Sequence, residues 1–135
     1  MQRLFAILFF LITQVVFAQT AWAYLMPVAG YGAEGSLYLE TDSIVRNGPS
    51  VTLTFIESLN QPRRYGSSSY LSKATDIRLD CSTRRLFALA ERFYSEANLQ
   101  GVMLGGFPLN DPFGSSPVDG SWDANLLKLG CGGLG

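Results

Sequence analysis

Three stretches of the sequence alternate between apolar and polar side chains, and this pattern restricts the fold more than any other feature. Residues 36–41, 51–55 and 77–81 each place apolar side chains at every second position. Side chains of a β-strand point alternately to its two faces, so the pattern predicts strands with one face in a core. Residues 47–49, Asn-Gly-Pro, are typical of a turn that joins two strands. Ile56 interrupts the second alternation, which predicts burial on both faces at that point.

Two other stretches have the composition of loops. Residues 60–69 contain Pro62 and Gly66 followed by three serines, and residues 107–120 contain three prolines and two glycines. Proline and glycine restrict or reverse the chain direction, and serine competes with backbone hydrogen bonding, so both stretches are predicted to be loops. Between them, the apolar residues 102–104 predict a short strand.

The segment of residues 84–101 fits two structures. Its apolar side chains recur at helical spacing, with Ser82 or Thr83 as a helix-capping residue and Gly101 as a terminator. The same segment also divides into two strand faces, one of them holding Phe87, Leu89 and Phe93. Local propensity alone favours the helix, and the alternative stays open at this stage.

Residues 121–129 predict a short C-terminal helix. Ser121 is suited to cap its first turn, and Lys128 is suited to its last turn, where a positive charge complements the helix dipole. Trp122, Leu126 and Leu129 form one apolar stripe, which is typical of a helix packed on a core. Gly130 is predicted to end the helix.

Residues 1–23 have the parts of a secretory signal peptide. Arg3 supplies an early positive charge, a long apolar run follows, and a small-x-small cleavage motif ends at Ala23. We expect cleavage after Ala23, with Ala18 as the second candidate, and a mature domain of residues 24–135 without a membrane span. No cysteine stands near the cleavage point, so no lipid anchor is expected there.

The sequence has two cysteines, Cys81 and Cys131. In an exported chain the default expectation is one disulfide. A pair of free or redox-active thiols is the alternative, which the wide spacing disfavours because it lacks the Cys-x-x-Cys geometry. A disulfide would clamp the C-terminal helix to the strand that ends at Cys81. In the chain-entropy model, closing a loop of about fifty residues stabilises the fold by roughly 4 kcal/mol.

Charge and composition exclude several functions. Without Arg3, the chain holds nine basic and eleven acidic residues, which argues against bulk binding to nucleic acid or anionic lipid. The chain has no histidine, so a Ser-His-Asp triad, a Cys-His pair and His-ligated metal sites are impossible. Asp76 and Asp80 share a strand face and are interpreted as solvated charges. We therefore expect no catalytic residues, no metal and no cofactor.

Four stretches of the chain resemble the surface-adhesin protein E family of Gram-negative bacteria. They are residues 38–44 (YLETDSI), 62–65 (PRRY), 77–81 (IRLDC) and 124–131 (ANLLKLGC), in the family's order. The resemblance implies an α+β fold, with a single antiparallel β-sheet and a C-terminal helix tethered to it by the disulfide. It also implies that residues 84–94 form a strand, and we follow it against the local helical pattern.

The resemblance further implies a function and a site. The family's namesake is similar to adhesins for matrix and serum proteins, vitronectin and laminin among them, so we expect a non-enzymatic binding protein. Arg63, Arg64 and Tyr65 are the candidate ligand-binding residues, because adjacent guanidinium groups beside an aromatic ring suit an acidic protein surface. Solvated loop charges are the alternative interpretation of the two arginines.

The sequence and the resemblance also imply a location and partners. We expect export to the periplasm or cell surface of a Gram-negative bacterium, a protein ligand from the matrix or the cell envelope, and no nucleic-acid partner. A homodimer is among the assemblies that the sequence allows. The alternative function is a periplasmic cell-envelope protein, either a small enzyme using Asp, Glu or Tyr or a stress factor. The absence of histidine and of a Gly-x-Ser-x-Gly motif favours the binding protein.

Overall fold

The computed structural model describes residues 25–132. The expected signal peptide and its cleavage site lie outside the described residues, so the domain boundary after Ala23 stays a prediction. Within residues 25–132, no helix has both the length and the apolar character needed to cross a membrane. The described chain forms, in order, β1 (Leu25–Pro27), β2 (Gly35–Asn47), β3 (Ser50–Tyr65), β4 (Ser68–Asp80), β5 (Arg85–Tyr94), the 3₁₀ turn η1 (Ala97–Leu99), β6 (Met103–Pro108) and α1 (Trp122–Cys131).

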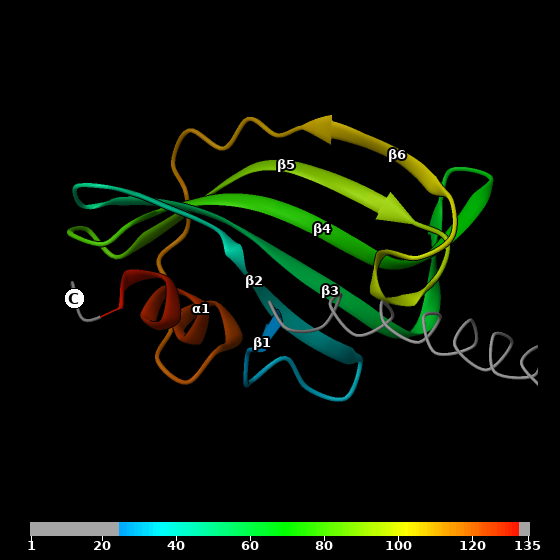
Figure 1. Ribbon diagram of the computed structural model, residues 1–135, viewed down its shortest axis with the longest axis horizontal. Coiled ribbons are helices and arrows are strands. Elements are labelled where there is room, and N and C mark those ends of the chain that lie inside the picture. Colours follow the sequence, from blue (N-terminus) through cyan, green and yellow to red (C-terminus); the bar gives the residue numbers. More distant parts are fainter. Residues whose placement is uncertain (1–24, 133–135) are drawn as a thin grey trace, which may run out of the picture.

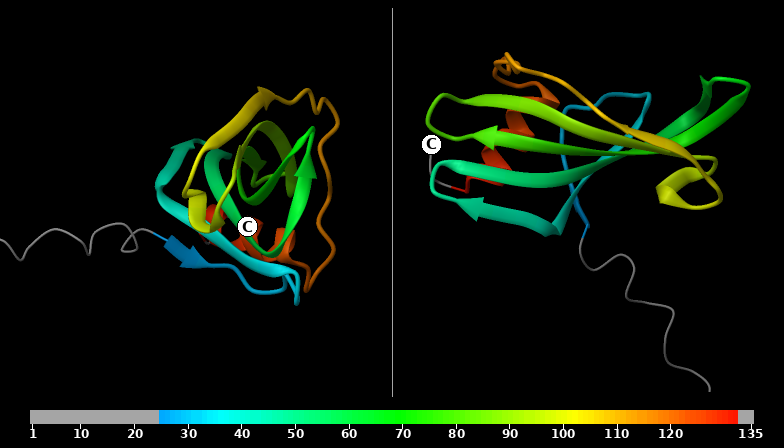
Figure 2. Two further views of the ribbon diagram at one scale, coloured as in Figure 1. Left: turned by 90° about the vertical axis from the view of Figure 1, so that its right-hand side faces the viewer. Right: turned by 90° about the horizontal axis from the view of Figure 1, so that it is seen from above.

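The six strands form one antiparallel sheet in which every strand pairs with its neighbour in the sequence (Figure 1). The sheet is strongly twisted, and α1 packs against one of its faces, which we call the inner face (Figure 2). Such a meander needs only short connections, because each strand pairs with the one that follows it. The predicted α+β fold, an antiparallel sheet with a C-terminal helix, is confirmed.

Two apolar clusters lie at opposite ends of the sheet. The first joins the sheet to α1 and contains the inward side chains of the predicted alternating strands, which are at most 5% exposed (Leu37, Leu39, Val51, Leu53, Phe55, Ile77, Leu79, Cys81). The second contains Leu59, Tyr70 and Phe93, with Tyr65 and Leu104 packed against it. Ile56 is also buried, as its break in the alternation predicted.

The disulfide between Cys81 and Cys131 is confirmed, with Cα atoms 5.8 Å apart. Cys81 directly follows β4, and Cys131 is the last residue of α1. Both residues are buried in the first cluster. The bond therefore fixes the C-terminal end of α1 to the end of β4, as the sequence predicted.

The helix starts where expected but ends later. The hydroxyl of Ser121 accepts a hydrogen bond from the backbone N–H of Ala124, so Ser121 is the N-cap. Gly130 lies inside the helix, and the terminator is Gly132, which adopts the left-handed conformation. The prediction that Gly130 ends the helix is wrong. Gly130 is needed there for close approach, because a Cβ atom would lie 2.4 Å from Cδ1 of Leu79.

Residues 85–94 form strand β5, so the local helical pattern was misleading and the implication of the family resemblance is confirmed. The segment pairs with β4 on one side and with β6 on the other, which outweighs local propensity. Ser82 and Thr83 do not cap a helix. Their backbone N–H groups, and the hydroxyl of Ser82, donate to Oδ1 of Asp80 in a turn. The Ser82 hydroxyl and these N–H groups lower the pKa of Asp80 to about 2.

The predicted loop at residues 107–120 is confirmed in part. The short strand at residues 102–104 exists, but as β6 it continues to Pro108 and so takes in the start of the predicted loop at residues 107–120. The rest of that loop has no regular structure until α1, apart from a bridge between Ser115 and Leu86. Asp111 holds it to the sheet, since its carboxylate accepts the backbone N–H of Ala88.

Candidate functional site

Arg63, Arg64 and Tyr65 lie on a hairpin and not in a loop. β3 runs through Tyr65 and β4 starts at Ser68, so the predicted loop at residues 60–69 is wrong. The two strands pair up to Tyr65 and Ser68, and Gly66 makes the turn with a φ of 60°. Pro62, which has no N–H to donate, falls in the stretch where the strand pairing is irregular.

We call the segment of residues 61–69 the hairpin tip. It extends past the rest of the sheet at the end far from α1 (Figures 1 and 2). Arg63 forms an ion pair with Glu34, with Nη2 and Oε2 2.5 Å apart. Arg64 is exposed, and no ion pair involving it occurs within residues 25–132. Neighbouring residues of a strand point to opposite faces, so the two guanidinium groups do not form one cluster.

Tyr65 anchors the hairpin tip instead of standing free. Its ring stacks on Phe93 with centroids 4.6 Å apart, and Tyr70 meets Phe93 edge-on at 4.8 Å. Gly105 of β6 leaves room for Tyr65, because a Cβ there would lie 2.4 Å from the tyrosine oxygen. Aromatic packing of this kind fixes the direction of the tip and leaves Arg64 as its free charged side chain.

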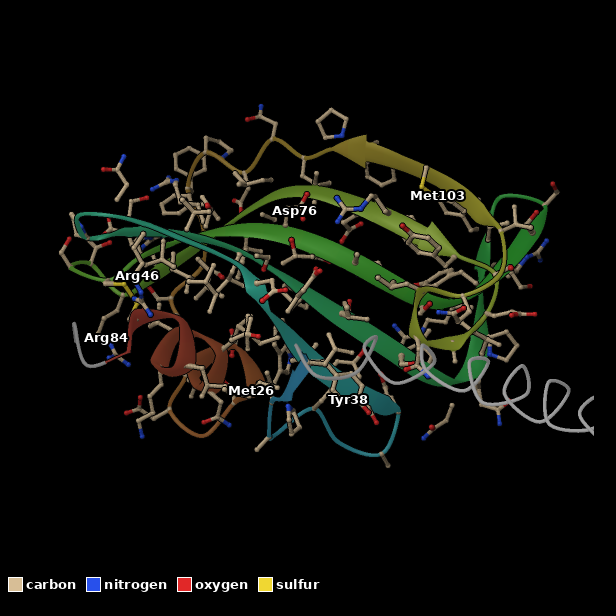
Figure 3. All side chains as sticks on the ribbon, viewed as in Figure 1. Met26, Tyr38, Arg46, Asp76, Arg84 and Met103 are labelled. Carbon is tan, nitrogen blue, oxygen red and sulfur yellow. A yellow bond between two sulfur atoms is a disulfide. The ribbon has the colours of Figure 1, made fainter. Side chains whose placement is uncertain are left out.

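The two aspartates that share a strand face have separate partners. Asp76, labelled in Figure 3, accepts two hydrogen bonds from Arg92 and one from Thr54. The bonds from Arg92 are the main reason why the pKa of Asp76 lies below its usual value. Asp80 is held by its own turn. Each carboxylate is thus stabilised in its charged form by neighbouring donors.

Sequence reasoning missed a row of charges on the inner face, between the two apolar clusters. Lys73 lies 2.9 Å from Oε2 of Glu57 and 3.2 Å from Oε1 of Glu91, and we call these three residues the charged row. Tyr31 donates its hydroxyl to Oε1 of Glu57 at 2.7 Å. The row joins β3, β4 and β5, and its side chains are only 12–20% exposed.

The charged row shifts the protonation of its members. Burial would lower the pKa of Lys73, but the two carboxylates outweigh it and the pKa lies above its usual value. Burial, together with the nearby Glu57, raises the pKa of Tyr31. Lys73 is therefore charged and Tyr31 neutral at physiological pH. Across residues 25–132, no group of three or more His, Cys, Asp or Glu side chains is arranged to hold a metal ion.

The six-stranded meander with a disulfide-tethered C-terminal helix defines a small α+β domain that presents a basic hairpin tip. Against known families, the model of the surface-adhesin protein E family matches residues 22–132. The chain belongs to this family, whose members are exported or surface proteins.

Solved structures show the same fold. The structure of Haemophilus influenzae protein E is 15% identical with a TM-score of 0.64, over 89% of this chain and 92% of that chain. Its crystal form II is 14% identical with a TM-score of 0.63, over 87% and 96% of the two chains. No curated protein matches the sequence.

Proposed function

We propose that the chain is an exported, non-enzymatic adhesin that binds an acidic segment of a host matrix or serum protein through its hairpin tip. Membership of the surface-adhesin protein E family supports the general role. The observation that carries the proposal is the exposed Arg64 on a protruding tip whose direction is fixed by the stacking of Tyr65 on Phe93. A preformed contact loses less conformational entropy on binding than a flexible loop does.

The two arginines have different roles in this proposal. Arg64 contacts the partner, while Arg63 holds the tip to the loop before β2 through Glu34. An exposed ion pair contributes only about 0–1 kcal/mol, so replacing Arg64 with alanine changes the affinity by no more than about fivefold. Charge steering acts mainly on association, so the reversal Arg64→Glu should slow binding and reduce its salt dependence.

The experiment measures surface binding of vitronectin and laminin at low and high salt. Wild type is compared with Arg64→Glu, with Arg63→Ala and with the double variant Arg63→Ala, Arg64→Ala. Arg46→Glu is the matched control, because Arg46 lies at the opposite end of the molecule (Figure 3). If wild type binds and Arg64→Glu associates at the same rate with the same salt dependence, the hairpin tip is not the contact site.

A wild type that binds neither ligand would contradict the adhesin role for these partners. A periplasmic role in the cell envelope would then be the better explanation. The same protein preparation can be tested against cell-envelope extracts, with Arg64→Glu again separating specific from non-specific binding.

A further inference from the structure

A cavity of about 250 Å³ opens on the inner face beside the charged row. Its floor is formed by side chains of β3, β4 and β5, and its rim by the start of α1 and by the loop that follows β6. Pockets for drug-sized ligands measure about 300–1,000 Å³, so this cavity suits a smaller molecule or the end of a longer one. The hairpin tip does not line it.

One polar group in this cavity has no partner. Thr75 lines the cavity and is only 3% exposed, and its hydroxyl oxygen makes no hydrogen bond within the described part of the chain. A buried hydroxyl left unpaired costs about 1–3 kcal/mol, so such groups are rare in the absence of a ligand or bound water. Thr75 pairs directly across the sheet with Glu91, which places the two side chains next to each other.

The charge around Thr75 favours a cation. Four carboxylates line the cavity, on Glu57, Glu91, Asp111 and Asp123, against the single ammonium group of Lys73. Lys73 uses only Oε1 of Glu91, which leaves Oε2 able to accept a further hydrogen bond. An anion in this cavity would meet a net negative potential, whereas a cation would find an unshared carboxylate oxygen beside an unpaired hydroxyl.

Two aromatic rings also line the cavity. Trp122, at the start of α1, packs on Phe55 with ring centroids 5.4 Å apart, and both residues line the cavity. Indole and phenyl faces attract cations, and tryptophan does so most strongly. Aromatic walls are a recurring environment of bound organic ammonium groups.

We propose that this cavity binds a small organic ammonium ion, which rests against Trp122 and donates hydrogen bonds to Glu91 Oε2 and, once the Thr75 side chain rotates toward the cavity, to Thr75 Oγ1. This is a small-molecule site separate from the hairpin tip, so it does not depend on the proposed adhesin function. An aliphatic amine of a few carbon atoms matches the cavity in charge and volume.

The test uses protein exported from cells that express the full chain, titrated calorimetrically with putrescine. Butanediol and butyrate serve as the uncharged and anionic probes of similar length. Putrescine should bind at least about tenfold more tightly than either, and high salt should weaken it. Equal binding of putrescine and butanediol, preference for butyrate, or no binding of putrescine at millimolar concentration would each overturn the proposal.

Two variants separate this site from adventitious binding. Thr75→Val keeps the shape and removes the unpaired hydroxyl, and Glu91→Gln removes the charge, so each should weaken putrescine binding about tenfold. Glu96→Gln changes an exposed carboxylate outside the cavity and should bind like wild type. In the absence of ligand, the Tm of the Thr75→Val variant should be at least as high as that of wild type. Unchanged binding by both cavity variants would show that putrescine binds elsewhere.

Discussion

Replacing Gly130 with alanine sets two effects of known sign against each other. Gly130 is a buried residue of α1 and faces the sheet. An added Cβ would lie 2.4 Å from Cδ1 of Leu79 and 2.8 Å from Cδ2 of Leu53. Carbon atoms pack best at about 3.5–4.0 Å, so the helix or both leucines must move. Leu79 is fully buried and Leu53 is 2% exposed, which leaves the leucines little space to yield.

The packing cost should exceed the gain in helix propensity. Alanine is favoured over glycine inside a helix by about 1 kcal/mol. Overpacking of a core costs about 1–3 kcal/mol. The disulfide at the next residue prevents α1 from moving away freely, so the upper part of that range applies. We expect Gly130→Ala to lower the free energy of unfolding by about 1–2 kcal/mol, and Tm by about 4–8 °C for each kcal/mol lost.

Urea denaturation followed by circular dichroism measures this change. Lys128→Ala, at an exposed position of α1, is the control and should alter the stability by less than about 0.5 kcal/mol. In a double-mutant cycle, Leu79→Val removes the nearer of the two clashing methyl groups, so Gly130→Ala should cost less in that background. If Gly130→Ala stabilises the protein as propensity alone predicts, the argument from close packing is wrong.

Three further predictions concern stability. Replacing both Cys81 and Cys131 with alanine should lower the free energy of unfolding by about 2–4 kcal/mol, measured by urea denaturation against wild type with and without reductant. An unchanged midpoint would contradict it. Ser121→Ala removes the N-cap of α1 and should cost about 0.5–2 kcal/mol. Because the folded pKa of Asp80 is lowered from 3.8 to about 2, its stabilising contribution is complete above pH 3.8 and is lost as pH falls toward 2. Asp80→Asn should therefore flatten that part of the stability–pH profile.

Sequence patterns predicted the parts of the fold that local chemistry determines. Alternation identified the inward residues of β2, β3 and β4, because a two-residue period is imposed by the strand itself. The Asn-Gly-Pro turn and the Ser121 cap depend on residues adjacent in sequence, and both occur as expected. The two cysteines, the only ones in the chain, form the expected bond.

The errors occur where distant contacts decide the structure. β5 has a helical apolar pattern but is held as a strand by two neighbours. Residues 60–69 have loop composition, yet ladder pairing with β4 and the stacking of Tyr65 on Phe93 extend the hairpin through them. Gly130 does not end the helix. A glycine is needed there because two leucines at least fifty residues away in sequence approach the helix closely at that point. None of these contacts can be read from a local window.

The candidate site was only partly accessible from the sequence. The arginine pair drew attention to the hairpin tip, but strand geometry separates Arg63 from Arg64, which local composition could not show. The charged row was missed, although β3 carries a signal for it. Its inward positions from Val51 to Leu59 are apolar except for one, Glu57. That single break, followed across the sheet to Lys73, would have pointed to the cavity.

The position of Glu57 supports the proposal that the cavity beside the charged row is a binding site. Buried ion pairs give little net stability compared with well-packed apolar side chains, because desolvation offsets most of their attraction. Apolar residues at all three positions of the row would let the two clusters meet in one continuous core. The sheet instead separates them with three charges, an unpaired threonine hydroxyl and a cavity. Proteins depart from consistent packing mainly where a site requires it, and here three such departures meet at one place on the inner face.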